Sequence, residues 1–573
     1  MSAEKLSVRT ANQYRTRDIV AYLGIRYYLA NKCTRRDLWA EDISIHLSQT
    51  KTTPVYFKSL HFKERSEEGA IVHREIFLPG PNEAYAEAAL LAECAKHQAF
   101  KSSAHVYSYT LASDSDTAGM YESYFPGIQR RHNNIAEACL DGDDLVVMYT
   151  DIKRFYPSIS PAVARDAWDK ACQESGIKKK YRDLGLKLLS HHELMSSSVG
   201  ESSGLLTGPM VSHLIANLVL KNVDKEFTDL FPGKYFRYVD DIILVGTECK
   251  VKSGRKLLRS RLKSLGLQLH DSGGDKDFII NAKDWLVGKD DFNDSASAGW
   301  AKLSRSVKQL LITQPEAAGA LSDMLSSNDI RMPLPDYEVA VKESGYVDRF
   351  VDSLKRNRWL LKTIFRDITP QSICDSAKSL RDSYSEKLKL LLNQGSAIKG
   401  YDRKRSIPKI RYFAGRLLYL EKKENLLSLS EQLMQYSELY LLAEVIAAVA
   451  SRDVTRILSL GSNAAQSAAQ ILKLELATVE CNVKNWGVVE LQGLAVLRAH
   501  GIIIDAPNID ELNNFILWKG HDKDLMRTKD PFIQELSCLH GSQGEPRHSG
   551  ILKTAFSRNE ELAFDVTTPL GTY

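Results

Sequence analysis

The 573-residue sequence predicts an α+β protein whose first half mixes strands with helices and whose second half is helical. In the first half, short apolar runs bounded by Gly, Pro and Asp alternate with helical patterns. From about residue 297 helical patterns dominate, and the Gly/Ser/Asp-rich stretch DFNDSASAG at 291–299 marks the boundary. We therefore predict a mixed domain over residues 1–295, a helical domain over 296–540 and a polar, turn-rich tail over 541–573.

The elements of the first half follow from local signals. The run LVVMYT has the length and composition of a buried strand. Ser160 is a typical N-cap, and Pro161 suits the first helical position. The predicted order is a strand at 145–150, helices opened by Ser160-Pro161 and Gly208-Pro209, a hairpin at 235–246, a helix at 256–265 and a strand at 277–280.

The second half contains several segments with helical spacing of apolar residues. They cover residues 348–365, 383–392, 407–423, 430–451 and 462–479. Alanine pairs such as Ala447-Ala448 favour helix and allow close helix packing. We find no fixed repeat period, as expected if irregular helix pairs were stacked.

Composition excludes several classes of protein. With 43% hydrophobic and 26% charged residues, the chain is neither disordered nor fibrous. The longest nearly apolar stretch, 439–450, is shorter than the roughly 20 residues that span a membrane, and the N-terminus lacks the apolar core of a signal peptide. Eight scattered cysteines without a CxxC pair predict a reducing, cytoplasmic location. The net charge of +4 is too small to indicate nucleic-acid binding by itself.

Three acidic residues form the strongest chemical signal. Asp151 ends a predicted strand, and Asp240 and Asp241 occupy a predicted hairpin tip. A lone Asp-Asp pair in a turn is usually only turn chemistry. Here the apolar arms, the third acid and the glycine-rich helix start occur together and in order. Three carboxylates at one sheet edge predict a site for Mg²⁺ or Mn²⁺, as in two-metal nucleotidyl transfer.

The ordered motifs resemble those of a reverse transcriptase over residues 10–295. The matching segments are YTDIKRFYPSI (149–159), GLLTGPMVSHLIANLVL (204–220), RYVDDIILVG (237–246), LKSLGLQLHDSGGDK (262–276) and WLVG (285–288). The resemblance implies fingers and a palm built on a ferredoxin-like sheet, with RNA-directed DNA polymerase activity on deoxynucleoside triphosphates. It makes Asp151, Asp240 and Asp241 the catalytic metal ligands and adds Ile152 to the metal site.

The resemblance also assigns nucleotide-binding residues. Tyr156 falls at the sugar-gate position, where a ring crowds a ribose 2′-hydroxyl; the alternative is a core aromatic. Phe155 belongs to the same segment, although a core role is the stronger interpretation. The segment HFKERSEEGAIVHREIFLPGP (61–81) resembles the part of the fingers that grips the triphosphate. The remaining residues of this set are Arg74, Lys63, Thr207, Gly208 and Lys276, with surface charge as the alternative for both lysines.

The sequence departs from the usual reverse-transcriptase pattern in two respects. Leu205-Leu206-Thr207-Gly208 stands where Leu-Pro-Gln-Gly is usual, so the glutamine that touches template or nucleotide is missing. The helical second half replaces the endonuclease module of many mobile-element enzymes. This architecture is similar to that of abortive-infection and defence-associated reverse transcriptases of bacteria, whose C-terminal halves are HEAT-like helical repeats.

Resemblance to that group implies phage defence, homo-oligomers, a single-stranded DNA product, a non-coding or template RNA, and synthesis that is sometimes untemplated or protein-primed. The alternatives are a mobile-element RNA-directed DNA polymerase and a catalytically idle scaffold that binds RNA or protein.

Two further features suggest contacts with nucleic acid. Basic residues interleave with aromatic ones at 398–416, and a similar segment covers 354–366. In the first segment we predict nucleic-acid binding by Arg403, Lys404, Arg405, Arg411 and Tyr412, with a solvated helix face as the equal alternative. The chain ends in Tyr573, a candidate primer hydroxyl for protein-primed synthesis or an incidental terminal residue.

Overall fold

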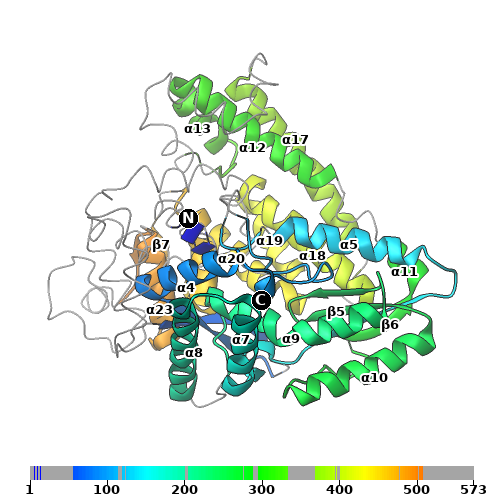
Figure 1. Cartoon of the computed structure of the whole chain (residues 1–573). Coiled ribbons are helices and arrows are strands. Elements are labelled where there is room, and N and C mark those ends of the chain that lie inside the picture. Colours follow the sequence, from blue (N-terminus) through cyan, green and yellow to red (C-terminus); the bar gives the residue numbers. More distant parts are fainter. Residues whose placement is uncertain are drawn as a thin grey trace, which may run out of the picture.

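The structure is a computed structural model of the whole chain. It describes residues 6, 9, 10, 13, 14, 56–66, 68–113, 119–122, 124–199, 204–274, 276–287, 295–332, 334, 368–393, 395, 400–475, 478–500 and 502–507. The described residues form an α+β protein with small sheets in the first half and a helical second half, as predicted (Figure 1).

The central sheet has four antiparallel strands in the order β4-β5-β3-β6. Its strands are β3 (Val146–Asp151), β4 (Tyr235–Tyr238), β5 (Asp241–Gly246) and β6 (Asp277–Asn281). The predicted strand, hairpin and final strand are therefore confirmed, with β3 at the centre beside β5. The last residue of β3 and the first of β5 lie at the same edge.

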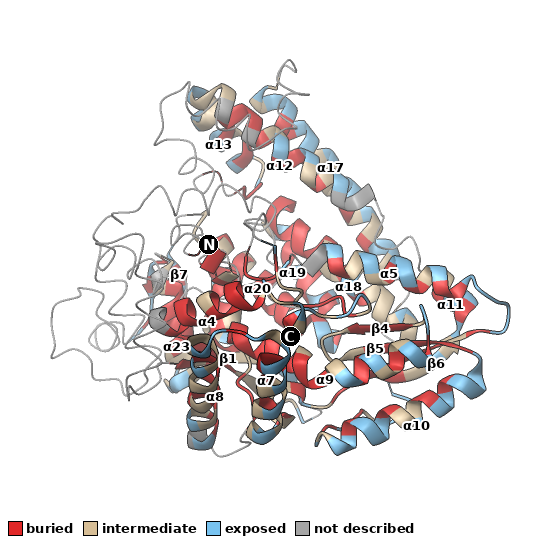
Figure 2. Ribbon diagram, viewed as in Figure 1, coloured by how far each residue is buried: buried red, intermediate tan, exposed pale blue. Residues whose placement is uncertain are grey.

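Alternating side chains of the central sheet serve two different cores. Met148 and Ile242 point toward the helices α9 (Met210–Leu230) and α10 (Glu248–Ser264). Tyr149 and Ile243 point to the opposite face, as the two-residue strand period requires. That face is covered by α5 (Tyr124–Cys139), α11 (Ala282–Leu286) and the start of α18 (Gly400–Leu420). Figure 1 shows α5 and α18 on one side of the sheet and α9 and α10 on the other, and Figure 2 shows that β4 and β5 between them are largely buried.

The helices between β3 and β4 are more numerous than predicted. After the one-turn α6 (Phe155–Ser158), α7 (Pro161–Ser175) begins at the Ser160 cap, whose side chain accepts a hydrogen bond from the Val163 N–H. An additional helix, α8 (Lys179–Val199), packs beside α7. The helix opened by Gly208-Pro209 is α9, as predicted.

A second sheet joins the two halves of the chain. It is the hairpin of β1 (Tyr56–Arg65) and β2 (Ile71–Pro79), followed by the 14-residue helix α4 (Pro81–Cys94) and the 3-10 turn Gln98–Phe100. The Leu60 N–H donates to the Gln492 side chain at 3.0 Å, and the Phe62 N–H donates to that of Asn463 at 2.9 Å. One hydrophobic core accordingly runs from this hairpin into the helical half.

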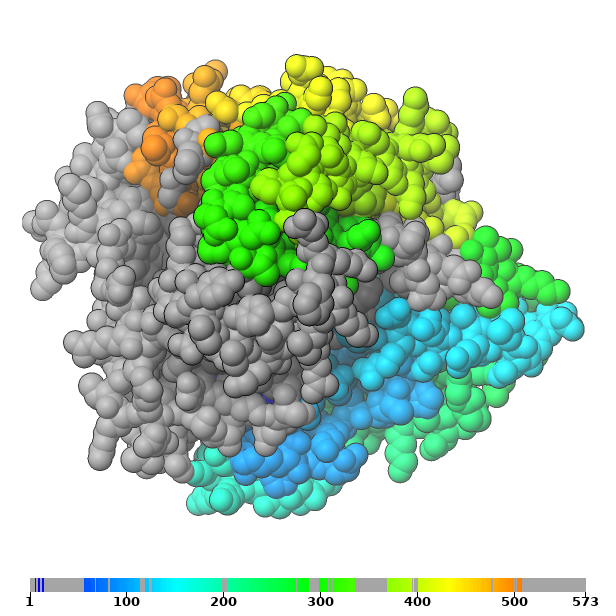
Figure 3. Space-filling view, turned by 90° about the horizontal axis from the view of Figure 1, so that it is seen from above, coloured from blue at the N-terminus to red at the C-terminus, as the bar shows by residue number. Residues whose placement is uncertain are grey.

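The helical half consists of helices packed as neighbours. They are α12 (Ser295–Thr313), α13 (Ala318–Ser326), α17 (Pro370–Leu392), α18, α19 (Lys423–Leu433), α20 (Tyr440–Ser451), α21 (Thr455–Leu460), α22 (Ser462–Leu472) and α23 (Val488–Ala499), with 3-10 turns at Pro315–Ala317 and Ser437–Leu439. Contacts are most extensive within α17–α18, α19–α20 and α22–α23. Seen from above, α12, α13 and α17 lie next to the later helices (Figure 3).

Three predictions about this half need correction. The predicted helix 430–451 is broken, because α19 ends at Leu433 and α20 begins only at Tyr440. The predicted helix 462–479 ends at Leu472. Val479 instead forms the strand β7 (Val479–Glu480), paired in parallel with β8 (Ile504–Asp505), so this half is not entirely helical. Val479 and Ile504 pair with each other, and both are β-branched residues, which favour the strand. The predicted helix 348–365 lies outside the described residues.

Candidate metal centre

The three predicted carboxylates meet at one edge of the central sheet. Asp151 ends β3 and is paired in register with Asp241, the first residue of β5. Asp240 lies in the two-residue turn that joins β4 to β5, since Tyr238 pairs with Asp241. One oxygen from each carboxylate lies within 4.8 Å of the others. We call Asp151, Asp240 and Asp241 the carboxylate triad.

The turn that carries Asp240 has an unfavourable backbone conformation. Val239 has a φ of 57°, in the left-handed region that β-branched residues rarely adopt. Its N–H donates to the Ser108 hydroxyl at 2.7 Å, and its carbonyl accepts from the Arg237 guanidinium at 2.8 Å. Arg237 is itself buried against Asp224 at 2.7 Å. These contacts hold the turn, and so fix Asp240 relative to Asp151.

The carboxylates of the triad are partly buried and repel one another. Burial, followed by the charge of Asp241, raises the pKa of Asp151, and the same two causes raise the pKa of Asp240 well above its ordinary value. The buried Oδ1 of Asp151 has no hydrogen-bond partner among the described residues. A divalent cation would coordinate this oxygen and would offset the repulsion between the carboxylates. Oxygen ligands without His or Cys suit Mg²⁺ or Mn²⁺, and which ion binds stays a prediction.

Four basic side chains surround the triad. Arg131 of α5 lies 3.8 Å from Asp241, and Lys276 and His270 lie 3.7 and 3.8 Å from Asp151. The Tyr149 hydroxyl donates a hydrogen bond to Asp241. Lys404 of α18 places its Nζ 3.0 Å from the centre of the Tyr149 ring.

Sequence analysis missed three of these contributors to the site, namely Tyr149, Arg131 and His270. Tyr149 could have been found, because it lies two residues before Asp151 and therefore on the same face of the strand. No local signal marks Arg131, whose position depends on how α5 packs over the sheet. Lys404 was predicted, but as a nucleic-acid contact rather than as a neighbour of the triad.

The predicted sugar-gate residue is held in place by a histidine. The Tyr156 hydroxyl lies 2.6 Å from Nδ1 of His213, whose ring is stacked on Tyr109 at 3.6 Å. Tyr156 is half-buried, whereas the neighbouring Phe155 is 3% exposed, in agreement with the core interpretation of Phe155. Ile152 is also buried, and only its main chain is a plausible ligand group.

Thr207 and Gly208 hold the loop before α9 against the β1–β2 hairpin. The Thr207 carbonyl accepts a hydrogen bond from the Phe77 N–H at 2.8 Å. Gly208 has a φ of 122°, and a Cβ there would lie 2.4 Å from the Phe77 carbonyl oxygen. The structure therefore gives both residues a main-chain role in positioning this loop.

Three of the predicted triphosphate residues, Lys63, Arg74 and Lys276, act electrostatically on Glu64 of the hairpin. The hydrogen bond from Lys63, at 2.7 Å, is the largest cause lowering the pKa of Glu64. The charges of Lys276 and Arg74 lower that pKa further. Lys276 also lies 3.7 Å from Asp151, so its charge acts on both the hairpin carboxylate and the triad.

The basic segment of α18 makes contacts within the protein. Arg403 pairs with Glu438 at 2.6 Å, and Arg411 donates to the Glu438 carbonyl at 2.9 Å. Arg405 donates to the Val287 carbonyl at 3.2 Å, and the Tyr412 ring packs edge-on against Phe413 at 5.5 Å. Nucleic-acid binding by this segment stays a prediction. The segment 354–366 and Tyr573 lie outside the described residues.

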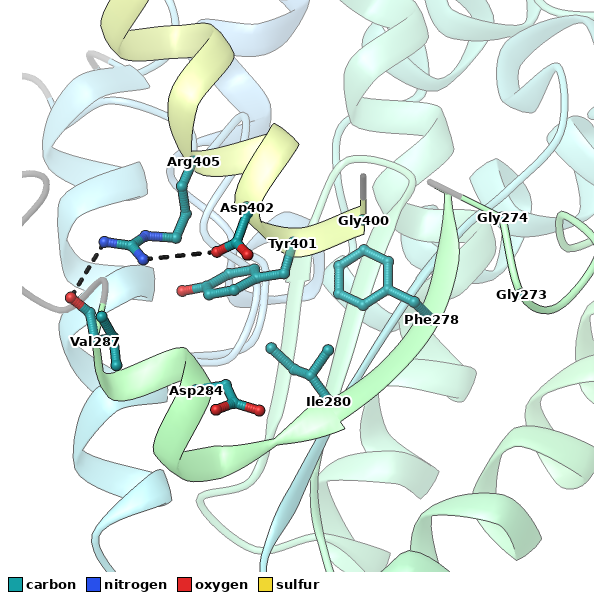
Figure 4. A pocket seen from close by; sticks show the side chains of 10 residues that line it. All are labelled: Gly273, Gly274, Phe278, Ile280, Asp284, Val287, Gly400, Tyr401, Asp402 and Arg405. Atoms are coloured by element: carbon teal, nitrogen blue, oxygen red, sulfur yellow. Dashed lines mark hydrogen bonds and ion pairs between the residues drawn. The ribbon is translucent and has the colours of Figure 1, made fainter. Parts of the chain in front are cut away.

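A pocket of about 510 Å³ opens where α18 meets β6 and α11 (Figure 4). Phe278 and Ile280 of β6 line one wall, and Tyr401 and Arg405 of α18 line the other. The Phe278 ring is stacked on Tyr149 at 5.2 Å, so the pocket adjoins the triad through this pair of rings. The turn at Trp285, which resembles a primer grip in sequence, is buried here against Tyr401 at 4.8 Å.

Comparison of the chain with protein-family models gave no match, and comparison with curated proteins gave none either. Among the described helices, none combines the length and apolar character that crossing a membrane requires.

Proposed function

We propose that the protein is a reverse-transcriptase-like DNA polymerase that transfers deoxynucleotides at the carboxylate triad. The observation that carries the proposal is the meeting of Asp151, Asp240 and Asp241 within 4.8 Å at one edge of an antiparallel sheet. The sheet has the connectivity strand, helices, hairpin, helix, strand and the order β4-β5-β3-β6, which is the ferredoxin-like arrangement expected of a polymerase palm.

Each part of the site has a role in this proposal. Asp151 and Asp240, with Asp241, would hold Mg²⁺ or Mn²⁺, which when bound lowers the pKa of an attacking hydroxyl and stabilises the leaving phosphate oxygen. Lys276, Lys63 and Arg74 would bind the triphosphate, because their positive charges attract its negative charge. Tyr156 would exclude a 2′-hydroxyl from the sugar site.

A role in bacterial antiviral defence is a further part of the proposal. It rests on the sequence resemblance to defence-associated reverse transcriptases and on the helical second half. The helix pairs α17–α18, α19–α20 and α22–α23 are compatible with a HEAT-like repeat. Deoxynucleotides, a DNA product, an RNA and further copies of the chain are the partners that this proposal implies.

The test is incorporation of labelled deoxynucleotides by the full chain, with and without an RNA template. Asp151→Asn and Asp240→Asn keep the side-chain shape but remove the ligand charge, so we expect incorporation to fall to background in both. Asp166→Asn, in an exposed α7 pair, is the matched control and should retain activity. We expect the melting temperature of the triad variants to be unchanged or higher, because acid–acid repulsion is relieved.

The result also separates the alternatives. Incorporation without template favours a defence enzyme over a mobile-element polymerase. If the wild type incorporates no nucleotide under any template condition, the catalytically idle scaffold would be the remaining alternative. Retained activity in Asp151→Asn would exclude the triad as the catalytic site.

A further inference from the structure

One of the cations around the triad comes from the distant helical half. Lys404 belongs to α18, more than 160 positions after Asp241 in the chain. Its Nζ lies 3.0 Å from the centre of the Tyr149 ring and 5.5 Å from that of Phe278. These rings are stacked on each other, so the ammonium group lies over the faces of an aromatic pair.

Lys404 is electrostatically linked to the triad. The Tyr149 hydroxyl donates a hydrogen bond to Asp241. The residue whose ring lies beneath the ammonium group is therefore in direct contact with the triad. Burial lowers the pKa of Lys404 to about 8, while the charges of Asp241 and Asp151 act in the opposite direction. At neutral pH the side chain therefore remains mostly charged and within the field of two triad members.

The position of Lys404 is fixed by contacts on both sides of it. The Tyr401 hydroxyl donates to the Trp285 carbonyl at 3.0 Å, and Arg405 donates to the Val287 carbonyl at 3.2 Å. Arg403 pairs with Glu438 at 2.6 Å. The first turns of α18 are thus anchored to α11 and to the helical half, and they present Lys404 to the face of the sheet that carries the triad.

The charges around the triad nearly balance without any metal. Three carboxylates face three cations, namely Arg131 at 3.8 Å from Asp241, Lys276 at 3.7 Å from Asp151, and Lys404 over Tyr149. A free divalent cation entering this site is attracted by the acids and repelled by all three bases. A metal that arrives with the triphosphate of a nucleotide brings compensating negative charge.

We propose that Lys404 is a positioning residue that acts as a built-in counter-ion of the carboxylate triad, so that the site holds a divalent cation weakly unless a nucleoside triphosphate accompanies it. The effect of Lys404 on binding of the metal alone depends only on the triad being a metal site. The effect of an added nucleotide on metal binding rests on the proposed function.

The experiment is titration of the full chain with Mn²⁺, followed by electron paramagnetic resonance of the free ion. Lys404→Met keeps the length of the side chain but removes its charge, so we expect Mn²⁺ to bind about tenfold more tightly than to the wild type. Lys404→Arg keeps the charge and should bind Mn²⁺ as the wild type does. Lys387→Met is the matched control, because Lys387 lies over the Phe413 ring of the helical half, and it should have no effect. Added deoxynucleoside triphosphate should tighten Mn²⁺ binding more in the wild type than in Lys404→Met.

The outcomes distinguish this inference from the proposed function. Unchanged Mn²⁺ affinity in Lys404→Met, with an unaltered circular dichroism spectrum, would overturn the role of Lys404 and leave the polymerase proposal standing. Equal tightening in Lys404→Arg and Lys404→Met would also overturn it, since charge would not be the cause. Wild-type Mn²⁺ binding in Asp151→Asn would remove the metal site and both proposals. If Lys404→Met binds Mn²⁺ more tightly although the wild type incorporates no nucleotide, the role of Lys404 would be supported and the polymerase proposal would not.

Discussion

Single side chains in this protein are positioned by partners that lie far away in the sequence. Tyr156 is bonded to His213, which is held in turn by stacking on Tyr109. The backbone near Tyr156 is also fixed, because the Leu205 N–H donates to its carbonyl at 3.1 Å. A ring that cannot move aside is what steric exclusion of a ribose hydroxyl requires.

Replacing Tyr156 should therefore change the choice of sugar. In Tyr156→Ala the ring is lost, and we expect ribonucleotide use relative to deoxynucleotide use to rise about ten- to hundredfold. Tyr156→Phe keeps the ring but loses the bond to His213, and it is expected to retain most of the wild-type preference. Competition between labelled nucleotides measures both. An unaltered sugar preference in Tyr156→Ala would make Tyr156 a packing residue only.

At the residue scale, sequence patterns were informative wherever the chemistry is local. Asp151, Asp240 and Asp241 could be predicted because a strand end and a hairpin tip are readable signals, and the structure brings these residues together. Two of the cations near them could not be predicted as neighbours of the triad. Arg131 and Lys404 reach the triad only because α5 and α18 cover one face of the sheet, and that packing has no short-range signature.

At the scale of elements, the loop before α9 is fitted closely to the β1–β2 hairpin. Gly208 makes this possible, because its φ of 122° and the approach to the Phe77 carbonyl leave no room for a side chain. Gly176, which ends α7, also has a positive φ, of 61°, but a Cβ there would meet nothing within 4 Å.

These two glycines allow a matched comparison. Gly208→Ala must strain the backbone and displace the loop from Phe77, so we expect a loss of about 3 kcal/mol or more in the free energy of unfolding. Gly176→Ala carries only the conformational cost, which is about 1 kcal/mol. Urea unfolding of both variants checks the difference. Equal losses would show that the loop can move away from the hairpin without cost.

Element boundaries could be predicted best where caps are explicit. The Ser160-Pro161 and Gly208-Pro209 starts are correct to within two residues. The break between α19 and α20 was missed, because the apolar pattern continues through residues 434–439 although the chain turns there. The strand at Val479 was missed since its pairing partner Ile504 lies 25 residues later.

At the scale of the whole molecule, the helical half contacts both sheets of the first half. It bonds to β1 through Asn463 and Gln492, and it covers the central sheet through Tyr401 and Lys404. The predicted domain boundary at residue 295 stays a prediction, because residues 288–294 lie outside the described chain. The contacts nevertheless imply that the stability of the sheets depends on the helical half.

Two buried titratable groups that contact Tyr56, namely Glu87 and His192, make the stability of the fold depend on pH. The Tyr56 hydroxyl donates to Glu87 at 2.8 Å, and its ring meets the edge of His192 at 5.5 Å. Burial raises the pKa of Glu87 from 4.5 to about 7, and burial lowers the pKa of His192 from 6.5 to about 3. Neither ring nitrogen of His192 has a hydrogen-bond partner among the described residues.

The two groups should act on the free energy of unfolding in opposite directions. Since the pKa of Glu87 is raised on folding, its contribution is fully present below pH 4.5 and is lost as pH rises through 7, by about 3 kcal/mol. Since the pKa of His192 is depressed, its contribution is present above pH 6.5 and is lost as pH falls toward 3, by about 2 kcal/mol already at pH 5. We expect Glu87→Gln to flatten the profile between pH 4.5 and 7, and His192→Phe, which keeps a ring against Tyr56, to flatten it below pH 6.5. Urea unfolding at intervals from pH 5 to 8 measures both slopes, and slopes identical to the wild type in either variant would show that the substituted group does not titrate with folding.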